Sequence, residues 1–124
     1  MLRSAHHAAS VAAFAGFASL GGSCAINAEP DFDSAVPQDR FLAIRQAQRT
    51  QDQSATPDLI RQLGSDDALV RLAAADALEE ITGLTHGFDS VAAESERAAA
   101  IDRWVQWLDA RGPEDAGRTS ERVP

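Results

Sequence analysis

Residues 56–82 carry two short apolar stripes at helical spacing, separated by a polar turn. The first stripe lies within residues 59–63. The second has the i, i+4, i+7, i+8, i+11 spacing of a helix with one buried face, and it consists of Val70, Ala74, Ala77, Leu78 and Ile81. Gly64 ends the first helix, and residues 65–67 offer capping oxygens to the second. The segment therefore predicts two helices joined by a tight turn.

The start of this pair and the helix before it are indicated by two prolines. Thr56 is expected to be the N-cap of the pair, with Pro57 as the first helical residue. An earlier helix is predicted to begin at Pro37, which is tolerated in a first turn, and to end near Gln51. Its apolar positions include Phe41, Ile44 and Ala47.

A fourth helix is predicted from about Ser95 to Arg111, because a glycine and a proline follow Arg111 as helix breakers. Residues 84–93 before it contain Gly87 and are expected to form a loop. The apolar residues that share one face of this fourth helix are Ile101, Trp104, Val105 and Leu108.

Composition agrees with an all-α fold. Hydrophobic residues make up 44% of the 124-residue chain, a length that suits one domain. Alanine, the best helix former, is prominent among them, and runs of β-branched or aromatic residues are few. The prediction is a short antiparallel array of about four helices packed closely through small side chains.

Three segments share the pattern Arg-x-x-Ala-[Ile/Ala]-x-x-apolar. They begin at Arg40, Arg71 and Arg97, at offsets of 31 and 26 residues. Residues 59–78 add a short helix with paired aliphatics, a tight acidic turn, Val-Arg and an alanine-rich helix ending in leucine. This combination resembles one repeat of the HEAT-like family. The resemblance implies that Arg71 either satisfies carbonyls of the turn or pairs with an acid of the adjoining repeat.

The resemblance extends over about residues 38–111. Ile81-Thr82-Gly83, Gly87-Phe88-Asp89 and a last helix containing Trp104 and Trp107 are similar to the closing segment of some bacterial HEAT-like proteins. This similarity implies that the fourth helix is a C-terminal cap whose tryptophans cover the open end of the stack. Trp104 is expected in the core. Trp107 is assigned either to the core edge or to a contact with a partner.

The N-terminus has the form of a signal peptide. Arg3 precedes an apolar stretch at residues 8–20, which is too short and too alanine-rich for a membrane span. Gly21-Gly22-Ser23-Cys24 follows and resembles the lipobox of bacterial lipoproteins, with Leu20 one place earlier than usual. The resemblance implies lipidation of Cys24, and ordinary cleavage after Ala25 or Ala28 is the alternative.

These features divide the chain into four parts. Residues 1–24 are assigned to the signal peptide with a possible lipobox, and residues 25–36 to a flexible acidic tether. Residues 37–111 form the HEAT-like helical domain, and residues 112–124 a disordered tail. The predicted location is outside the cytoplasm, either in the periplasm or attached to a membrane by the lipid.

Charge and residue types restrict the function. Removal of the first 23 residues takes away one arginine and no acid, which changes the net charge from −8 to −9 and disfavours nucleic acid as a partner. His86, near Asp89, is the one histidine outside the signal. A His–carboxylate pair can serve acid–base chemistry, but a solvent-exposed loop histidine is the simpler interpretation.

No motif for catalysis, a metal or a cofactor accompanies these residues. We therefore expect a non-enzymatic protein-interaction or scaffold module of the bacterial cell envelope, whose partner is a protein. An accessory subunit of an envelope enzyme and a structural lipoprotein without a dedicated partner are the alternatives.

Overall fold

The computed structural model describes residues 28–112, which contain four α-helices and one 3-10 turn. In chain order these are α1 (Pro37–Thr50), η1 (Gln53–Ala55), α2 (Thr56–Gln62), α3 (Ala68–Thr82) and α4 (Glu94–Arg111). No residue of this range belongs to a strand, so the all-α prediction is confirmed. The predicted signal peptide with Cys24 lies outside the described residues, as does the predicted tail from residue 113 onwards.

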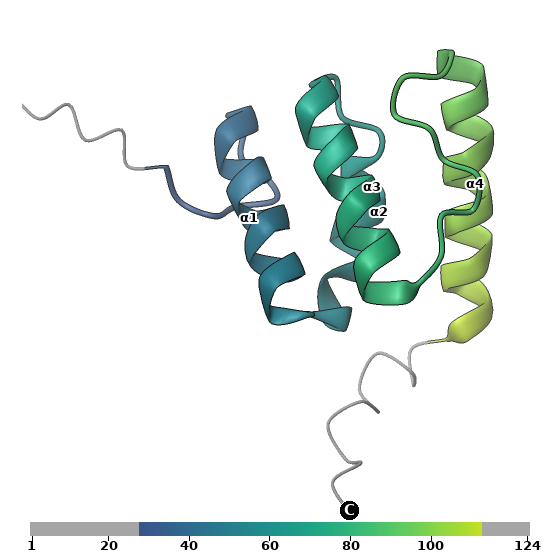
Figure 1. Cartoon of the computed structure of the whole chain (residues 1–124), viewed down its shortest axis with the longest axis horizontal. Helices are drawn as coiled ribbons and strands as arrows, with labels where there is room; N and C mark the ends of the chain where they lie inside the picture. Colours follow the sequence, from purple (N-terminus) through teal and green to yellow (C-terminus); the bar gives the residue numbers. More distant parts are fainter. Residues whose placement is uncertain (1–27, 113–124) are drawn as a thin grey trace, which may run out of the picture.

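The helices are arranged as a short array (Figure 1). α1, α3 and α4 follow one another across the molecule and run in the same direction, whereas α2 runs the opposite way behind α3. α3 is the centre of the array, because it packs directly against both α1 and α2. α4 makes its main helix contact with α2, and residues 83–93 rise between α3 and α4.

The helix ends agree with the sequence, with one exception. Asp67 caps α3, and its carboxylate accepts hydrogen bonds from the next two helical N–H groups at 2.9 and 3.0 Å. Gly83 ends α3 at φ +76°, and its N–H donates to the Glu79 carbonyl at 2.8 Å. The prediction that Thr56 is an N-cap is wrong. Thr56 is itself helical, because η1 leads directly into α2, and its hydroxyl donates back to the Gln53 carbonyl.

The core lies where α1, α2, α3 and α4 meet. Its large side chains that are almost completely shielded from solvent are Trp104, Ile44, Leu59, Leu63, Leu78 and Val70. The repeated sequence pattern maps onto this core. The corresponding alanines and the corresponding apolar residues are each at most 5% exposed, and they are Ala43, Ala74 and Ala100, then Ala47, Leu78 and Trp104.

The arginines that open the repeated pattern also have related contacts. The Nη1 group of Arg71 donates to the carbonyls of Ser65 and Asp66 at 2.9 and 3.1 Å, so of the two alternatives Arg71 satisfies the turn carbonyls. Arg97 likewise donates from Nη1 to a carbonyl five residues earlier, at 2.6 Å. Arg40 instead reaches the carboxylate of Asp66 in the neighbouring turn, at 3.4 Å. Each arginine therefore ties the first turn of its helix to a loop or turn.

Residues 28–36 differ from the flexible tether predicted for residues 25–36. Phe32 packs on the core from outside the helices, and its carbonyl accepts a hydrogen bond from Gln62 Nε2 at 2.9 Å. The Ser34 hydroxyl donates to the carboxylate of Asp39 at 2.8 Å. An aromatic ring on the core and two tertiary hydrogen bonds fix this segment against α1 and α2.

Arg61 makes a further link between this segment and α2. Its guanidinium pairs with Asp58 of the same helix and, at 2.9 Å, with Asp33 of the N-terminal segment. Hydrogen bonds to these two carboxylates raise the pKa of Arg61 above its usual value. The three side chains are between 39% and 75% exposed to solvent, so the pairs contribute little stability.

Candidate interaction surface

Trp104 joins α4 to the rest of the molecule. It is 1% exposed, and its indole Nε1 donates to the Thr85 carbonyl in the preceding loop at 3.1 Å. The prediction of a core position is therefore confirmed. The hydrogen bond matters because a buried indole N–H without an acceptor would be unfavourable.

Trp107 lies one helical turn further along α4 and has two environments. Its ring meets Trp104 edge to face, with ring centroids 5.3 Å apart, and packs against the core cluster. The residue is nevertheless only partly buried, and Arg111 lies over its ring with the guanidinium carbon 4.5 Å from the centroid. Trp107 is thus a core-edge residue that also contributes to the surface.

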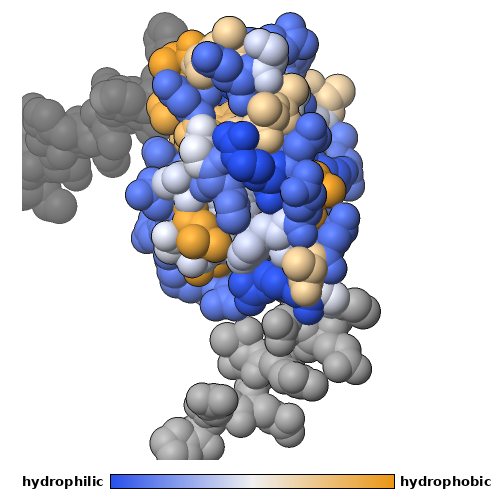
Figure 2. Space-filling view, turned by 90° about the vertical axis from the view of Figure 1, so that its right-hand side faces the viewer, coloured by the Kyte–Doolittle hydropathy of each residue, from blue (hydrophilic) through white to orange (hydrophobic). Residues whose placement is uncertain are grey.

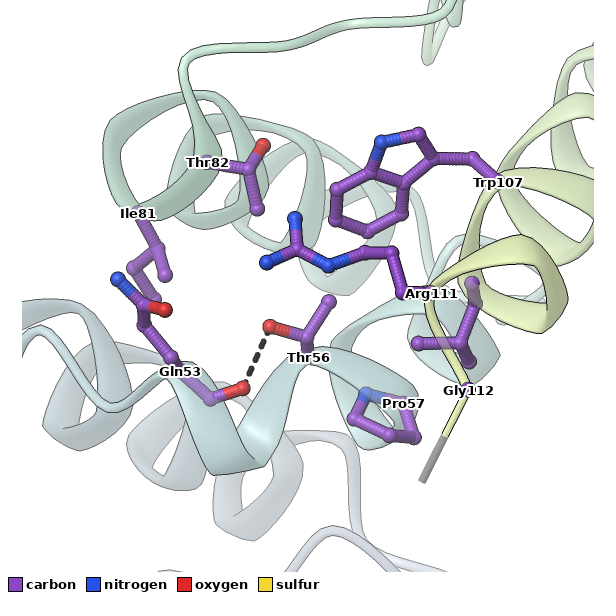
Figure 3. A pocket seen from close by; sticks show the side chains of 9 residues that line it. Gln53, Thr56, Pro57, Ile81, Thr82, Trp107, Arg111 and Gly112 are labelled. Carbon is purple, nitrogen blue, oxygen red and sulfur yellow. Dashed lines mark hydrogen bonds between the residues drawn. The ribbon is translucent and has the colours of Figure 1, made fainter. Parts of the chain in front are cut away.

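A pocket of about 240 Å³ opens beside Trp107 (Figure 3). It lies between the C-terminal ends of α3 and α4 and the start of α2, including η1. Its lining residues are Gln53, Thr56, Pro57, Ile81, Thr82, Trp107, Leu108, Arg111 and Gly112. In Figure 3 the Arg111 side chain extends from α4 beneath the Trp107 ring, between Thr82 and Thr56.

The polar groups of this pocket differ in whether they already have partners within the chain. The hydroxyls of Thr56 and Thr82 donate to the carbonyls of Gln53 and Leu78 at 2.7 and 2.6 Å. The Thr82 oxygen also accepts the Leu84 N–H at 3.2 Å. Arg111 takes part in none of the ion pairs found among residues 28–112. The pocket therefore combines an aromatic wall, aliphatic side chains and a cationic donor that has no carboxylate partner within residues 28–112. Such a surface suits an amphipathic or acidic side chain of another protein.

His86 is placed differently from the solvent-exposed loop residue that the sequence suggested. It is partly buried, with its ring edge-on to Trp104 at a centroid distance of 4.4 Å. Its backbone has φ +47°, and its carbonyl accepts a hydrogen bond from Arg103 Nε at 2.8 Å. Its buried Nε2 atom has no hydrogen-bond partner among the residues that the structure describes. Sequence reasoning missed this contact because no periodic signal links a loop residue to a helix 18 positions later.

The His–carboxylate pair considered from the sequence is not formed in the structure. Asp89 Oδ1 accepts the backbone N–H of Val91 at 3.0 Å, within its own turn. Within the described part of the chain, no group of three or more His, Cys, Asp or Glu side chains is placed to hold a metal ion. Cys24, predicted as a lipidation site, lies outside that part.

Comparison of the chain with models of protein families, with curated proteins and with solved structures finds no match. Among the helices of residues 28–112, none combines the length and the apolar character needed to cross a membrane.

Proposed function

We propose that this chain is a non-enzymatic protein-interaction module of the bacterial cell envelope, built on a HEAT-like repeat. The observation that carries the proposal is the pocket at Trp107 and Arg111. Tryptophan and arginine are, with tyrosine, the residue types enriched among those that dominate protein–protein binding energy. Here both line an open pocket, and the ring is held in place by the core behind it.

The arrangement of the helices supports the HEAT-like part of the proposal. α2 and α3 form an antiparallel pair, and α1 and α4 flank it. The outer side of α4 is mostly hydrophilic, with hydrophobic groups in small separate areas (Figure 2). A polar outer face is what the terminal unit of a repeat array requires, because no further repeat covers it. On this interpretation α4 closes the array.

The non-enzymatic part is supported by how the candidate chemical groups are used. His86 packs on tryptophan, Asp89 caps a turn, and the two threonine hydroxyls of the pocket bind carbonyls. The envelope location rests on the predicted signal peptide and on the lipobox-like sequence before Cys24.

Affinity capture from native membranes tests the proposal. The mature chain is expected to retain at least one defined envelope protein, which is then purified and shown to bind directly. Trp107→Ala should abolish that binding. Val105→Ala is the matched control, because Val105 is 42% exposed on the same helix but does not line the pocket.

Equal capture by the Trp107→Ala variant would reject the pocket as the binding site. A stable monomer that retains no protein would favour the structural lipoprotein instead. An enzymatic turnover that is lost on His86→Ala would favour the accessory-subunit alternative.

The envelope location is tested separately. Mass spectrometry of the mature N-terminus should find a lipid-modified Cys24, and Cys24→Ala should release the protein from membranes. An unmodified chain that begins at Ile26 or Glu29 would reject lipidation and leave export in place.

A further inference from the structure

α3 presents a second surface that no other helix covers. Its residues Leu69, Leu72, Asp76 and Glu79 follow the i, i+3, i+7, i+10 spacing of one helix face, and all four are exposed. Leu69 is 68% and Leu72 is 46% exposed, which is unusual for leucines on a central helix. Two leucines followed by two carboxylates along one face make an amphipathic strip.

The loop before α4 turns this strip into a groove. A pocket of about 210 Å³ lies between the strip and the loop, and Trp104 contributes to its wall. Its lining residues are Leu72, Ala75, Asp76, Glu79, Thr85, Phe88, Asp89, Ser90 and Trp104. Apolar residues line both sides of the groove. Phe88 among them is partly buried and packs on the core beneath the groove. Val91, which follows the lining residue Ser90 in the chain, is 88% exposed.

The charged residues that line the groove are all negative. Three of its lining residues are acids, namely Asp76, Glu79 and Asp89, and none is a base. None of the three belongs to the ion pairs found among residues 28–112. The adjacent Glu80 behaves differently, because it accepts hydrogen bonds from Gln48 of α1 and from Gln51, which caps the end of that helix. The acids of the groove are therefore unneutralised within the described part of the chain.

We infer that this groove binds a basic amphipathic segment of a partner protein, which inserts one arginine or lysine side chain. The aliphatic stem of such a side chain packs on Leu72 and Phe88, and its charged head reaches Asp76, Glu79 and Asp89. Leucine-sized side chains of the same segment cover Leu69 and Val91. The negative charge opposes phosphate groups, so it excludes an anionic lipid surface or a nucleic acid as the occupant.

This inference rests on the proposed function, since it names the kind of partner that an interaction module of this chain recognises. It concerns a different surface from the Trp107 pocket. The two surfaces share none of their lining residues. The tryptophans of the two surfaces touch each other, whereas the charged residues Asp76 and Glu79 of the groove and Arg111 of the pocket belong to one surface each, so variants of these charged residues let the two proposals fail independently.

Nuclear magnetic resonance titration of the mature, isotope-labelled chain tests the inference. The probes are two short synthetic helical peptides with the same leucine spacing. One peptide has arginine, and the other glutamate, at the positions between the leucines. The arginine peptide should cause saturable shifts at Leu72, Asp76, Glu79, Phe88 and Asp89. The glutamate peptide should cause none. Raising the salt from about 0.1 to about 1 M should weaken binding, because the screening length falls from about 10 to about 3 Å.

The decisive test compares two double variants that change the net charge by the same amount, one in the groove and the other on α4. Asp76→Lys/Glu79→Lys should weaken binding of the arginine peptide at least about tenfold. The control Asp102→Lys/Asp109→Lys alters two exposed acids of α4 and should leave it unchanged. Asp76→Asn/Glu79→Gln should give an intermediate loss, and unfolding by urea shows whether each variant is folded. Arg111→Ala, which changes the Trp107 pocket but no lining residue of the groove, should bind the arginine peptide normally.

Several outcomes would overturn the inference. These are no saturable shift in the groove, equal shifts with both peptides, or equal losses in the two charge-reversed variants. Shifts at the groove that depend on protein concentration alone would indicate a second copy of the chain as occupant. Displacement of the arginine peptide by millimolar magnesium, with shifts confined to the three acids, would indicate a cation site instead.

Discussion

α3 and α4 carry the same sequence pattern but are built into the molecule in different ways. Both have an arginine in the first turns that donates to carbonyls of the preceding segment. In both, the alanine three positions later is fully buried. α3, however, packs directly on two helices, whereas α4 packs mainly on α2 and is separated from α3 by residues 83–93.

The residue at the last position of the pattern reflects this difference. α3 has Leu78 there and α4 has Trp104, and both are buried. A leucine suffices where helices touch directly. Where a loop lies between helices, the larger indole fills the space and also donates to the loop carbonyl of Thr85. The loop side of α4 is thus closed by one aromatic residue and its hydrogen bond.

Both candidate binding surfaces border this end of the array. The Trp107 pocket lies at the C-terminal end of α4, and the acidic groove lies between α3 and the loop. Hollows are not confined to this end, because one of about 270 Å³ lies where the first turn of α1 meets the start of α3. What distinguishes the end at α4 is that its hollows are lined by tryptophan and by charged side chains.

Truncation of Trp104 provides the strongest test of this comparison. Trp104→Ala should lower the free energy of unfolding by about 3–5 kcal/mol, and Leu78→Ala by about 2–5 kcal/mol, because both leave a cavity in the core. Trp107→Ala should cost less than either, since that ring is partly exposed. Urea unfolding of the three variants gives the order. A Trp104→Ala loss below that of Trp107→Ala would show that α4 is not attached through Trp104.

Replacement of the first-turn arginines should have a smaller effect. Arg71→Met keeps the aliphatic stem but leaves the carbonyls of Ser65 and Asp66 without this donor, so we expect a loss of about 2 kcal/mol. Arg97→Met removes one such bond and should cost about 1 kcal/mol. Arg49→Met, at an exposed position of α1, is the control and should change stability little. Equal losses at all three positions would mean that the carbonyl contacts do not stabilise the turns.

The N-cap of α3 is expected to contribute about as much as one of these contacts. Asp67→Ala removes an acceptor for two N–H groups of the first turn and should cost about 1 kcal/mol of unfolding free energy. Asp66→Ala is the neighbouring control, because the Asp66 side chain is 93% exposed and its one partner within residues 28–112 is Arg40, at 3.4 Å. The difference between their urea midpoints measures the cap. No difference would contradict the capping geometry.

These features differ in how far the sequence predicts them. The helices, the cap at Asp67, the stop at Gly83 and the buried alanines all follow from local chemistry or from helical spacing, and the structure confirms them. The docking of Phe32, the contact of His86 with Trp104 and both pockets depend on segments that meet only in three dimensions. A loop has no period from which such contacts can be inferred. Trp107 stands out in the sequence by its residue type, whereas the helical residues Arg111 and Asp76 become candidates only through the neighbours that the fold gives them.

The last difference between α3 and α4 is the side-chain N-cap, which α3 has and α4 lacks. Adding a cap to α4 should have the smallest effect of the changes considered. α4 has Ala93 at the N-cap, with extended dihedral angles of −58° and 149° and no side-chain acceptor. Ala93→Ser adds the acceptor that α3 already has, so we expect about 0.5–1 kcal/mol of additional stability. Ala98→Ser, at an exposed interior position of α4, is the control and should be slightly destabilising, because serine is a poorer helix former than alanine. If both serines lower the urea midpoint equally, the N–H groups of α4 are satisfied in another way, and the lack of a cap is not what distinguishes this end of the array.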